Sequence, residues 1–226
     1  MDRIDLPPNE ARRVTVSVKI ALQLAAEAIA AVDEEKLPAR LAAVFACSGG
    51  NSEALAKVLG SLSEGVVSPN QFAHLGHNAA SGYWSLIQGR PAPTTSLGAF
   101  DGSFAAGLIE AASQVVTDGC SVLFVSCDVP PPAALHDCRP VTTVFGASLI
   151  LTPPPPQGVD GAWLDLQLVS GEREDQLTDP VLEALRRDNP AARGLPLFLL
   201  SAQRKAGRVV LPLVANRRLA AEYAPC

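Results

Sequence analysis

Short apolar segments alternate with helix-like segments between residues 40 and 127, and this alternation narrows the possible folds more than any other feature of the sequence. Segments 40–47 and 121–127 have the length and the apolar content of buried strands. Three helical patterns lie between these two segments, at 52–62, 71–88 and 101–117. Strands that alternate with helices form a sheet with helices packed on its faces. The sequence therefore predicts an α/β fold with a mixed sheet covered by helices.

The remaining segments extend this pattern toward both ends of the chain. An alanine-rich helix is predicted over 13–34 and a strand over 94–100. After a proline-rich loop, the predicted elements are strands over 144–151, 162–170, 195–200 and 208–214 and a short helix over 181–187. Prolines at 153–156 predict a rigid turn. We expect a single domain over 1–226, in which 153–226 is a more variable C-terminal portion.

Composition and charge argue against several classes of function. The net charge is −5 and no run of Lys or Arg occurs, so no nucleic-acid partner is expected. The longest apolar helix candidate, 20–32, contains Gln23 and Glu27 and is too short to span a membrane. The first residues lack the pattern of a signal peptide, which predicts a cytoplasmic protein. The five cysteines have no CxxC spacing, so neither a disulfide framework nor a zinc site is expected, and nothing predicts a cofactor.

Several short motifs occur in a characteristic order. Asn-Ala-Ala-Ser-Gly at 78–82 precedes Ser-Leu-Ile-Gln-Gly at 85–89, and Ser-Phe-Ala-Ala-Gly-Leu-Ile-Glu-Ala follows at 103–111. Gly-Ala-Ser-Leu-Ile-Leu occupies 146–151. Together they resemble the N-terminal domain of β-ketoacyl synthases, in particular short, chain-length-factor-like proteins of aryl polyene pathways. The resemblance covers roughly residues 10–151 and implies a thiolase-like half-domain.

The resemblance also implies where a condensing enzyme would carry its nucleophilic cysteine. Counting back along the helix from Glu110 places that position at Asp101. A carboxylate is a poor acceptor for a transferable acyl group but a good N-cap, so we expect Asp101 to cap a helix that begins at Gly102. The family's decarboxylation uses two histidines from the C-terminal half, whereas His136 is the last histidine of this sequence. The resemblance therefore implies a protein that is not a condensing enzyme.

Other residues near this position are candidates for a pocket or an interface: His77, Asn78, Phe100 and Ser103. His74 and His77 are three residues apart on a predicted helix and would share a face. A buried His77 bonded to the backbone is favoured over a metal ligand or a pocket residue.

Two alternatives rest on residue types alone. A serine hydrolase or acyltransferase would combine Ser96 or Ser103 with His77 and Asp101, but the sequence lacks a Gly-x-Ser-x-Gly motif. The acidic cluster at 172–175 is interpreted as a solvated loop.

The strand over 94–100 bears on the choice of partner. Members of the wider fold pair through the strand before the nucleophile, and an exposed edge strand favours pairing with another chain. We expect a homodimer or a heterodimer with a full-length ketosynthase, and acyl carrier protein is a further possible partner. The resemblance implies a non-catalytic, chain-length-factor-like subunit in fatty-acid-like or polyketide-like (aryl polyene) biosynthesis. The alternatives are a module that binds an acyl chain or an acyl carrier, and an acyl hydrolase or acyltransferase.

Overall fold

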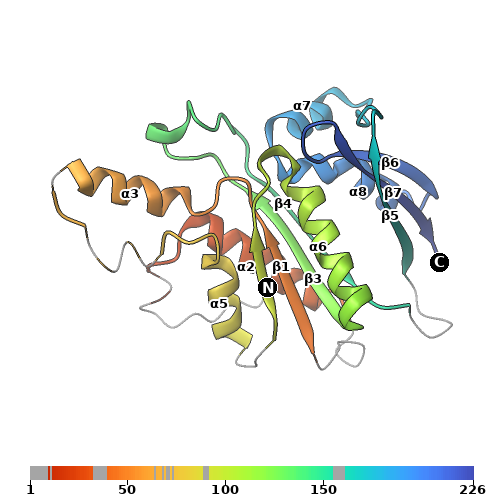
Figure 1. Cartoon of the computed structure of the whole chain (residues 1–226), viewed down its shortest axis with the longest axis horizontal. Helices are drawn as coiled ribbons and strands as arrows, with labels where there is room; N and C mark the ends of the chain where they lie inside the picture. The colour runs from red at the N-terminus through yellow and green to blue at the C-terminus, as the bar shows by residue number, and fades with distance from the viewer. Residues whose placement is uncertain are drawn as a thin grey trace.

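Four strands form a mixed sheet at the centre of the computed structural model (Figure 1). The structure describes residues 10–226 except 11, 33–39, 64, 68, 70–71, 73, 89–91 and 155–160. The strand order is β2-β1-β3-β4, with bounds Thr94–Leu97 for β2, Leu41–Ala46 for β1, Ser121–Asp128 for β3 and Phe145–Leu151 for β4. Strand β1 runs parallel to β2 and β3, and β4 runs antiparallel to β3. This sheet, called sheet A, confirms the predicted mixed sheet.

Helices cover both faces of sheet A because its strands are apolar on both sides. Alternate residues of a strand point to opposite faces. Phe45 and Val125 therefore share one core with α2 (Val16–Ala30) and α5 (Ala79–Gln88), whereas Val44 and Phe124 share another with α6 (Ser103–Asp118). Helix α3 (Ser52–Ser63) extends away from the sheet in Figure 1.

The C-terminal portion forms a second sheet, called sheet B. It is antiparallel, with order β5-β7-β6 and bounds Ala162–Ser170, Arg217–Pro225 and Gly207–Pro212. Val209 and Leu211 of β6 belong to the same core as Phe104 and Leu108 of α6. Two short helices, α7 (Pro180–Asp188) and α8 (Leu195–Ala202), lie between β5 and β6 in the chain. Sheet B and α8 therefore extend the core that α6 shares with sheet A, and Phe198 of α8 contacts Phe104 of α6.

Several predicted elements differ from the observed ones. The strand predicted over 195–200 is helix α8, because an uninterrupted apolar segment carries no periodicity and Pro196 begins the helix well. Strand β7 was not predicted. The helix predicted over 71–88 is interrupted, because Phe72 is helical, residues 74–78 form no helix and α5 begins at Ala79. Parts of the predicted 13–34 helix and of the 153–156 turn, and the first nine residues, lie outside the described residues.

No helix among the described residues has the length and apolarity needed to cross a bilayer.

Candidate functional site at the start of helix α6

Asp101 lies in a short 3-10 turn, Phe100–Gly102, that leads from β2 into α6. Its carboxylate accepts a hydrogen bond from Arg139 Nη2 at 2.7 Å, and its other oxygen lies 3.6 Å from Arg193 Nη2. Helix α6 begins at Ser103 and has no side-chain N-cap, so the prediction that Asp101 caps this helix was wrong. The carboxylate turns instead toward the two arginines, where both members of each pair carry a charge.

Ser103 fixes the turn before α6. Its side chain is fully buried, and its hydroxyl donates to Phe100 O at 2.7 Å while accepting from Ala99 N at 2.9 Å. These two bonds hold Phe100 at φ 53°, in the left-handed region that a bulky residue rarely adopts. Ser103 is thus engaged with the backbone.

Arg139 connects three separate segments. Its Nε donates to Ser48 Oγ at 3.2 Å, and its Nη2 binds Asp101. Its guanidinium carbon lies 3.8 Å from the centre of the Phe100 ring, a cation–π contact. The side chain thereby joins the loop after β1 to the start of α6.

Asp128, the last residue of β3, is 2% exposed and completes this polar network. Its Oδ1 accepts from Ser48 N at 2.8 Å, from Ser48 Oγ at 2.6 Å and from Cys47 Sγ at 3.5 Å. Its Oδ2 has no hydrogen-bond partner among the described residues. Burial raises the pKa of this carboxyl, and the bonds from Ser48 oppose the increase.

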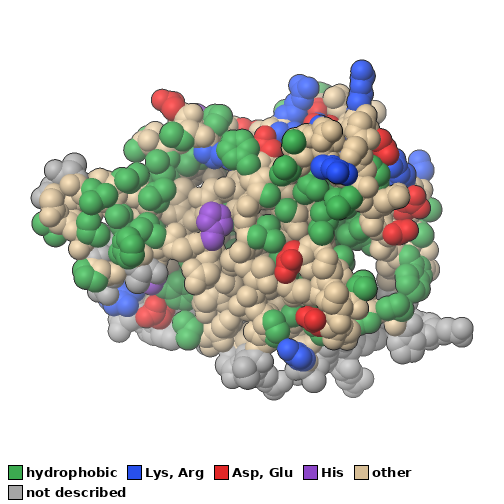
Figure 2. Space-filling view, in the orientation of Figure 1, with side chains coloured by type: hydrophobic (Ala, Val, Ile, Leu, Met, Phe, Trp, Pro, Cys, Tyr) green, Lys and Arg blue, Asp and Glu red, His purple; other side chains and the backbone are tan. Residues whose placement is uncertain are grey.

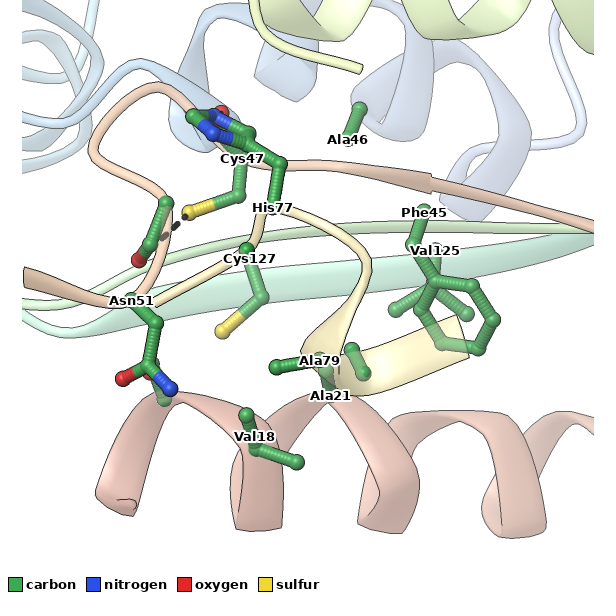
Figure 3. A pocket seen from close by; sticks show the side chains of 14 residues that line it. Val18, Ala21, Phe45, Ala46, Cys47, Asn51, His77, Ala79, Val125 and Cys127 are labelled. Carbon is green, nitrogen blue, oxygen red and sulfur yellow. Dashed lines mark hydrogen bonds between the residues drawn. The ribbon is translucent and has the colours of Figure 1, made fainter. Parts of the chain in front are cut away.

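Two thiols lie beside this network, on the α2 face of sheet A. Figure 3 shows the side chains of Cys47 and Cys127 pointing into the same small cavity above α2. Burial, followed by the charge of Asp128, raises the pKa of Cys47 well above its usual range and that of Cys127 to about 12. An acyl-accepting cysteine needs the opposite shift, because the thiolate is the nucleophile.

His77 contacts the backbone of Cys47 and not its sulfur. Its Nε2 lies 3.3 Å from Cys47 O. The ring packs against Gly50 and Gly98, where an added Cβ would come within 2.7 Å and 2.8 Å of ring atoms. His77 is exposed, so the expectation of a buried histidine was wrong. The cavity that it lines has a volume of about 30 Å³, room for a water molecule but not for an acyl chain.

Asn78 and His74 have local roles. Asn78 is exposed, and its carbonyl accepts from Ser81 Oγ and Gly82 N at the start of α5. The His74 ring stacks on Tyr83, with ring centres 6.2 Å apart. The two histidines occupy turns before α5 and so do not share a helix face. Among the described residues no group of three or more His, Cys, Asp or Glu side chains is placed to hold a metal ion.

The predicted hydrolase set is not brought together. Ser103 is bonded to the turn, and Ser96 Oγ donates to Ser81 Oγ at 2.8 Å. His77 contacts Cys47 O and Asp101 contacts Arg139.

Sequence reasoning missed the charged side chains behind Asp101. Arg193 lies 3.8 Å from Glu174, and the almost fully buried Arg186 pairs with Glu174 and, at 2.7 Å, with Glu183. The bond from Arg186 lowers the pKa of Glu183 to about 2. The expectation of a solvated acidic loop was therefore wrong for Glu174. The partners are far apart in the chain, so no local pattern indicated them.

The comparisons with known proteins agree with this architecture. A family model described as the β-ketoacyl synthase N-terminal domain matches residues 2–204. The chain belongs to this family. No curated protein matches it closely enough in sequence to be informative.

Solved structures show the same thiolase-like α/β fold. A chain of "Ketosynthase (ApeO) in Complex with its Chain Length Factor (ApeC)" from Xenorhabdus doucetiae has a TM-score of 0.71 at 21% identity, with 98% of this chain and 83% of that chain covered. The ishigamide ketosynthase/chain length factor gives a TM-score of 0.66 at 13% identity, with 100% of this chain and 85% of that chain covered. A β-ketoacyl synthase from Burkholderia phymatum STM815 gives a TM-score of 0.58 at 15% identity, with 83% of this chain and 56% of that chain covered. The predicted family and fold class are confirmed.

Proposed function

We propose that this chain is a non-condensing, chain-length-factor-like subunit that pairs with a full-length ketosynthase in fatty-acid-like or polyketide-like biosynthesis of the aryl polyene type. One observation carries the proposal. At the position that the resemblance gives to the acyl-accepting cysteine, the carboxylate of Asp101 lies between Arg139 and Arg193.

The neighbouring groups support a protein that accepts no acyl chain. Cys47 is the thiol attached to the same network, and its raised pKa keeps it protonated at neutral pH. His77, the imidazole beside it, contacts a carbonyl oxygen and does not reach the sulfur as a base would.

The free edge of sheet A supports a protein partner. Strand β2 pairs only with β1 among the described strands, so its outer edge presents unpaired backbone groups. In Figure 1 this strand lies at the front of sheet A, and Figure 2 shows hydrophobic side chains gathered over α3 on the same face. The exposed leucines of α3 are Leu55, Leu59 and Leu62. Two of the structural relatives are complexes of a ketosynthase with a chain length factor, which favours a ketosynthase as the partner.

Co-purification with candidate full-length ketosynthases tests the proposal. The matched variants are Ser96→Pro and Ser96→Ala. Cys47 N donates to Leu97 O and Ala43 N to Pro93 O, so the amide of Ser96 points away from β1. Proline removes that outward N–H, whereas alanine keeps it, and both remove the bond to Ser81. We expect Ser96→Pro to lose the complex and Ser96→Ala to retain it. Wild-type protein that binds no ketosynthase contradicts the proposal.

A second candidate, an acyl-chain-binding module, is favoured by a larger cavity of about 430 Å³. This volume lies in the range of small-molecule sites. Its walls come from β4, β5, β7 and α8, and include Leu149, Leu151, Leu164, Leu197, Phe198 and Tyr223. We expect decanoate to bind wild-type protein in a calorimetric titration, and Leu164→Trp, which fills the cavity, to abolish the binding. If decanoate gives no heat of binding with wild-type protein, this candidate function is rejected.

A further inference from the structure

The ring of Phe100 is presented at the surface by a rigid local structure. It is 62% exposed although it lies three residues before Ser103, the buried first residue of α6. The backbone of Phe100 is held at φ 53°, a strained conformation for a bulky residue. Strain of this kind persists only where the surroundings impose it, and it concentrates at functional positions.

Three contacts impose the conformation. The Ser103 hydroxyl bonds to the backbone on both sides of Phe100, through Ala99 N and Phe100 O. The guanidinium of Arg139 covers one face of the ring at 3.8 Å. Gly102 is wedged against the loop after β6, because an added Cβ there would overlap the carbonyl group of Leu213.

The position of the Arg139 side chain is fixed by hydrogen bonds, and its charge is neutralised by a carboxylate. It binds Asp101 at 2.7 Å and Ser48 at 3.2 Å, and its side chain is only 14% exposed. Binding therefore does not need an acidic side chain of the partner beside Arg139. The uncovered face and edge of the Phe100 ring suit an apolar pocket.

We propose that Phe100, supported by Arg139, is the anchor by which this chain binds its ketosynthase partner, inserting its ring into an apolar pocket of that subunit. The inference rests on the proposed function. Phe100 follows the free strand β2 after only Gly98 and Ala99, so a partner that pairs with this edge reaches the ring as well. Aromatic and arginine side chains are enriched at interface centres, and a ring ordered before binding loses little entropy on association.

The test compares Phe100→Ala with Val116→Ala, which truncates another exposed apolar side chain on α6 (83% exposed). The dissociation constant of each variant for the full-length ketosynthase that co-purifies with the wild-type chain is measured by calorimetry. We expect Phe100→Ala to weaken binding about 30-fold, as for an interface hot spot, and Val116→Ala to change it less than about threefold. Phe100→Leu, which keeps apolar bulk, is expected to lie between them, and it also serves if the alanine variant does not fold.

The outcomes separate the two proposals. If wild-type protein binds no ketosynthase, the proposed function and the anchor both fail. If wild-type and Phe100→Ala proteins bind equally well, the anchor alone is refuted. Weakened self-association in Phe100→Ala with unchanged ketosynthase binding would assign the ring to contacts between two copies of this chain and would overturn the inference.

Discussion

The two faces of sheet A differ sharply where its parallel strands end. On the α6 face the carboxylate of Asp101 is held between two arginines. On the α2 face Cys47 and Cys127 lie beside a small apolar cavity, and burial raises the pKa of both thiols. A condensing enzyme needs a sulfur in a setting that stabilises its thiolate. In this chain the two arginines face Asp101, whereas the sulfurs of Cys47 and Cys127 lie on the other face, and the proposed non-condensing role rests on this separation.

The largest expected effect concerns the charged network behind the α6 face. Arg186→Ala leaves the carboxylates of Glu183 and Glu174 without their buried cation. Breaking a buried pair by removing one partner costs about 3–5 kcal/mol, and because both carboxylates retain some exposure we expect about 3 kcal/mol. Urea unfolding measures the loss. The exposed neighbour provides the control, since Arg187→Ala is expected to cost less than about 1 kcal/mol. Equal losses of unfolding free energy in the two variants would show that the buried ion pairs of Arg186 do not stabilise the fold.

The second prediction places a sulfur on the charged face. In Asp101→Cys the new thiol faces Arg139 and Arg193, which stabilise its thiolate, whereas Cys47 stays buried. We expect iodoacetamide at pH 7 to label the introduced thiol at least about tenfold faster than Cys47 or Cys127, measured by peptide mass spectrometry. Peptide mapping separates these sites from the exposed Cys138 and Cys226. If Cys47 is labelled faster than the introduced thiol, the predicted difference in thiolate stability between the two faces is wrong.

The smallest expected effect is a pH dependence at Asp128, which contacts Cys47 and Ser48. Its pKa is raised by burial, so the folded state binds a proton more tightly than the unfolded state. The resulting stabilisation is complete below the unfolded pKa and is lost as the pH rises through the folded one. Asp128→Asn cannot ionise, so its stability relative to wild type is expected to be higher at pH 7 than at pH 4. Urea unfolding at the two pH values measures this, and a difference that stays constant with pH contradicts it.

Most strands and helices that build the two faces of sheet A could be predicted from the sequence. The apolar segments 40–47 and 121–127 indicated buried strands, which are β1 and β3, and the helix predicted over 101–117 is observed as α6. The segment 195–200 was predicted as a strand because a wholly apolar run has no period; it is helical, and its Phe198 packs against Phe104 of α6.

The candidate site was only partly predictable for a different reason. The family resemblance pointed to Asp101, yet the predicted cap was wrong because the partners of its carboxylate, Arg139 and Arg193, come from distant segments. The closeness of Cys47 and Cys127 follows from the parallel register of β1 and β3, in which Ala46 pairs with Ser126. Such register is decided by the folded sheet and not by any local signal.

Intact-mass spectrometry after incubation with an acylated carrier protein tests the non-condensing role most directly. The wild-type chain and its ketosynthase partner are incubated together with the carrier, and the mass of each subunit is measured. The ion-paired carboxylate at Asp101 and the protonated Cys47 predict that the acyl mass appears on the ketosynthase alone. A stable acyl adduct on this chain, at Asp101 or at any of its cysteines, would contradict the account.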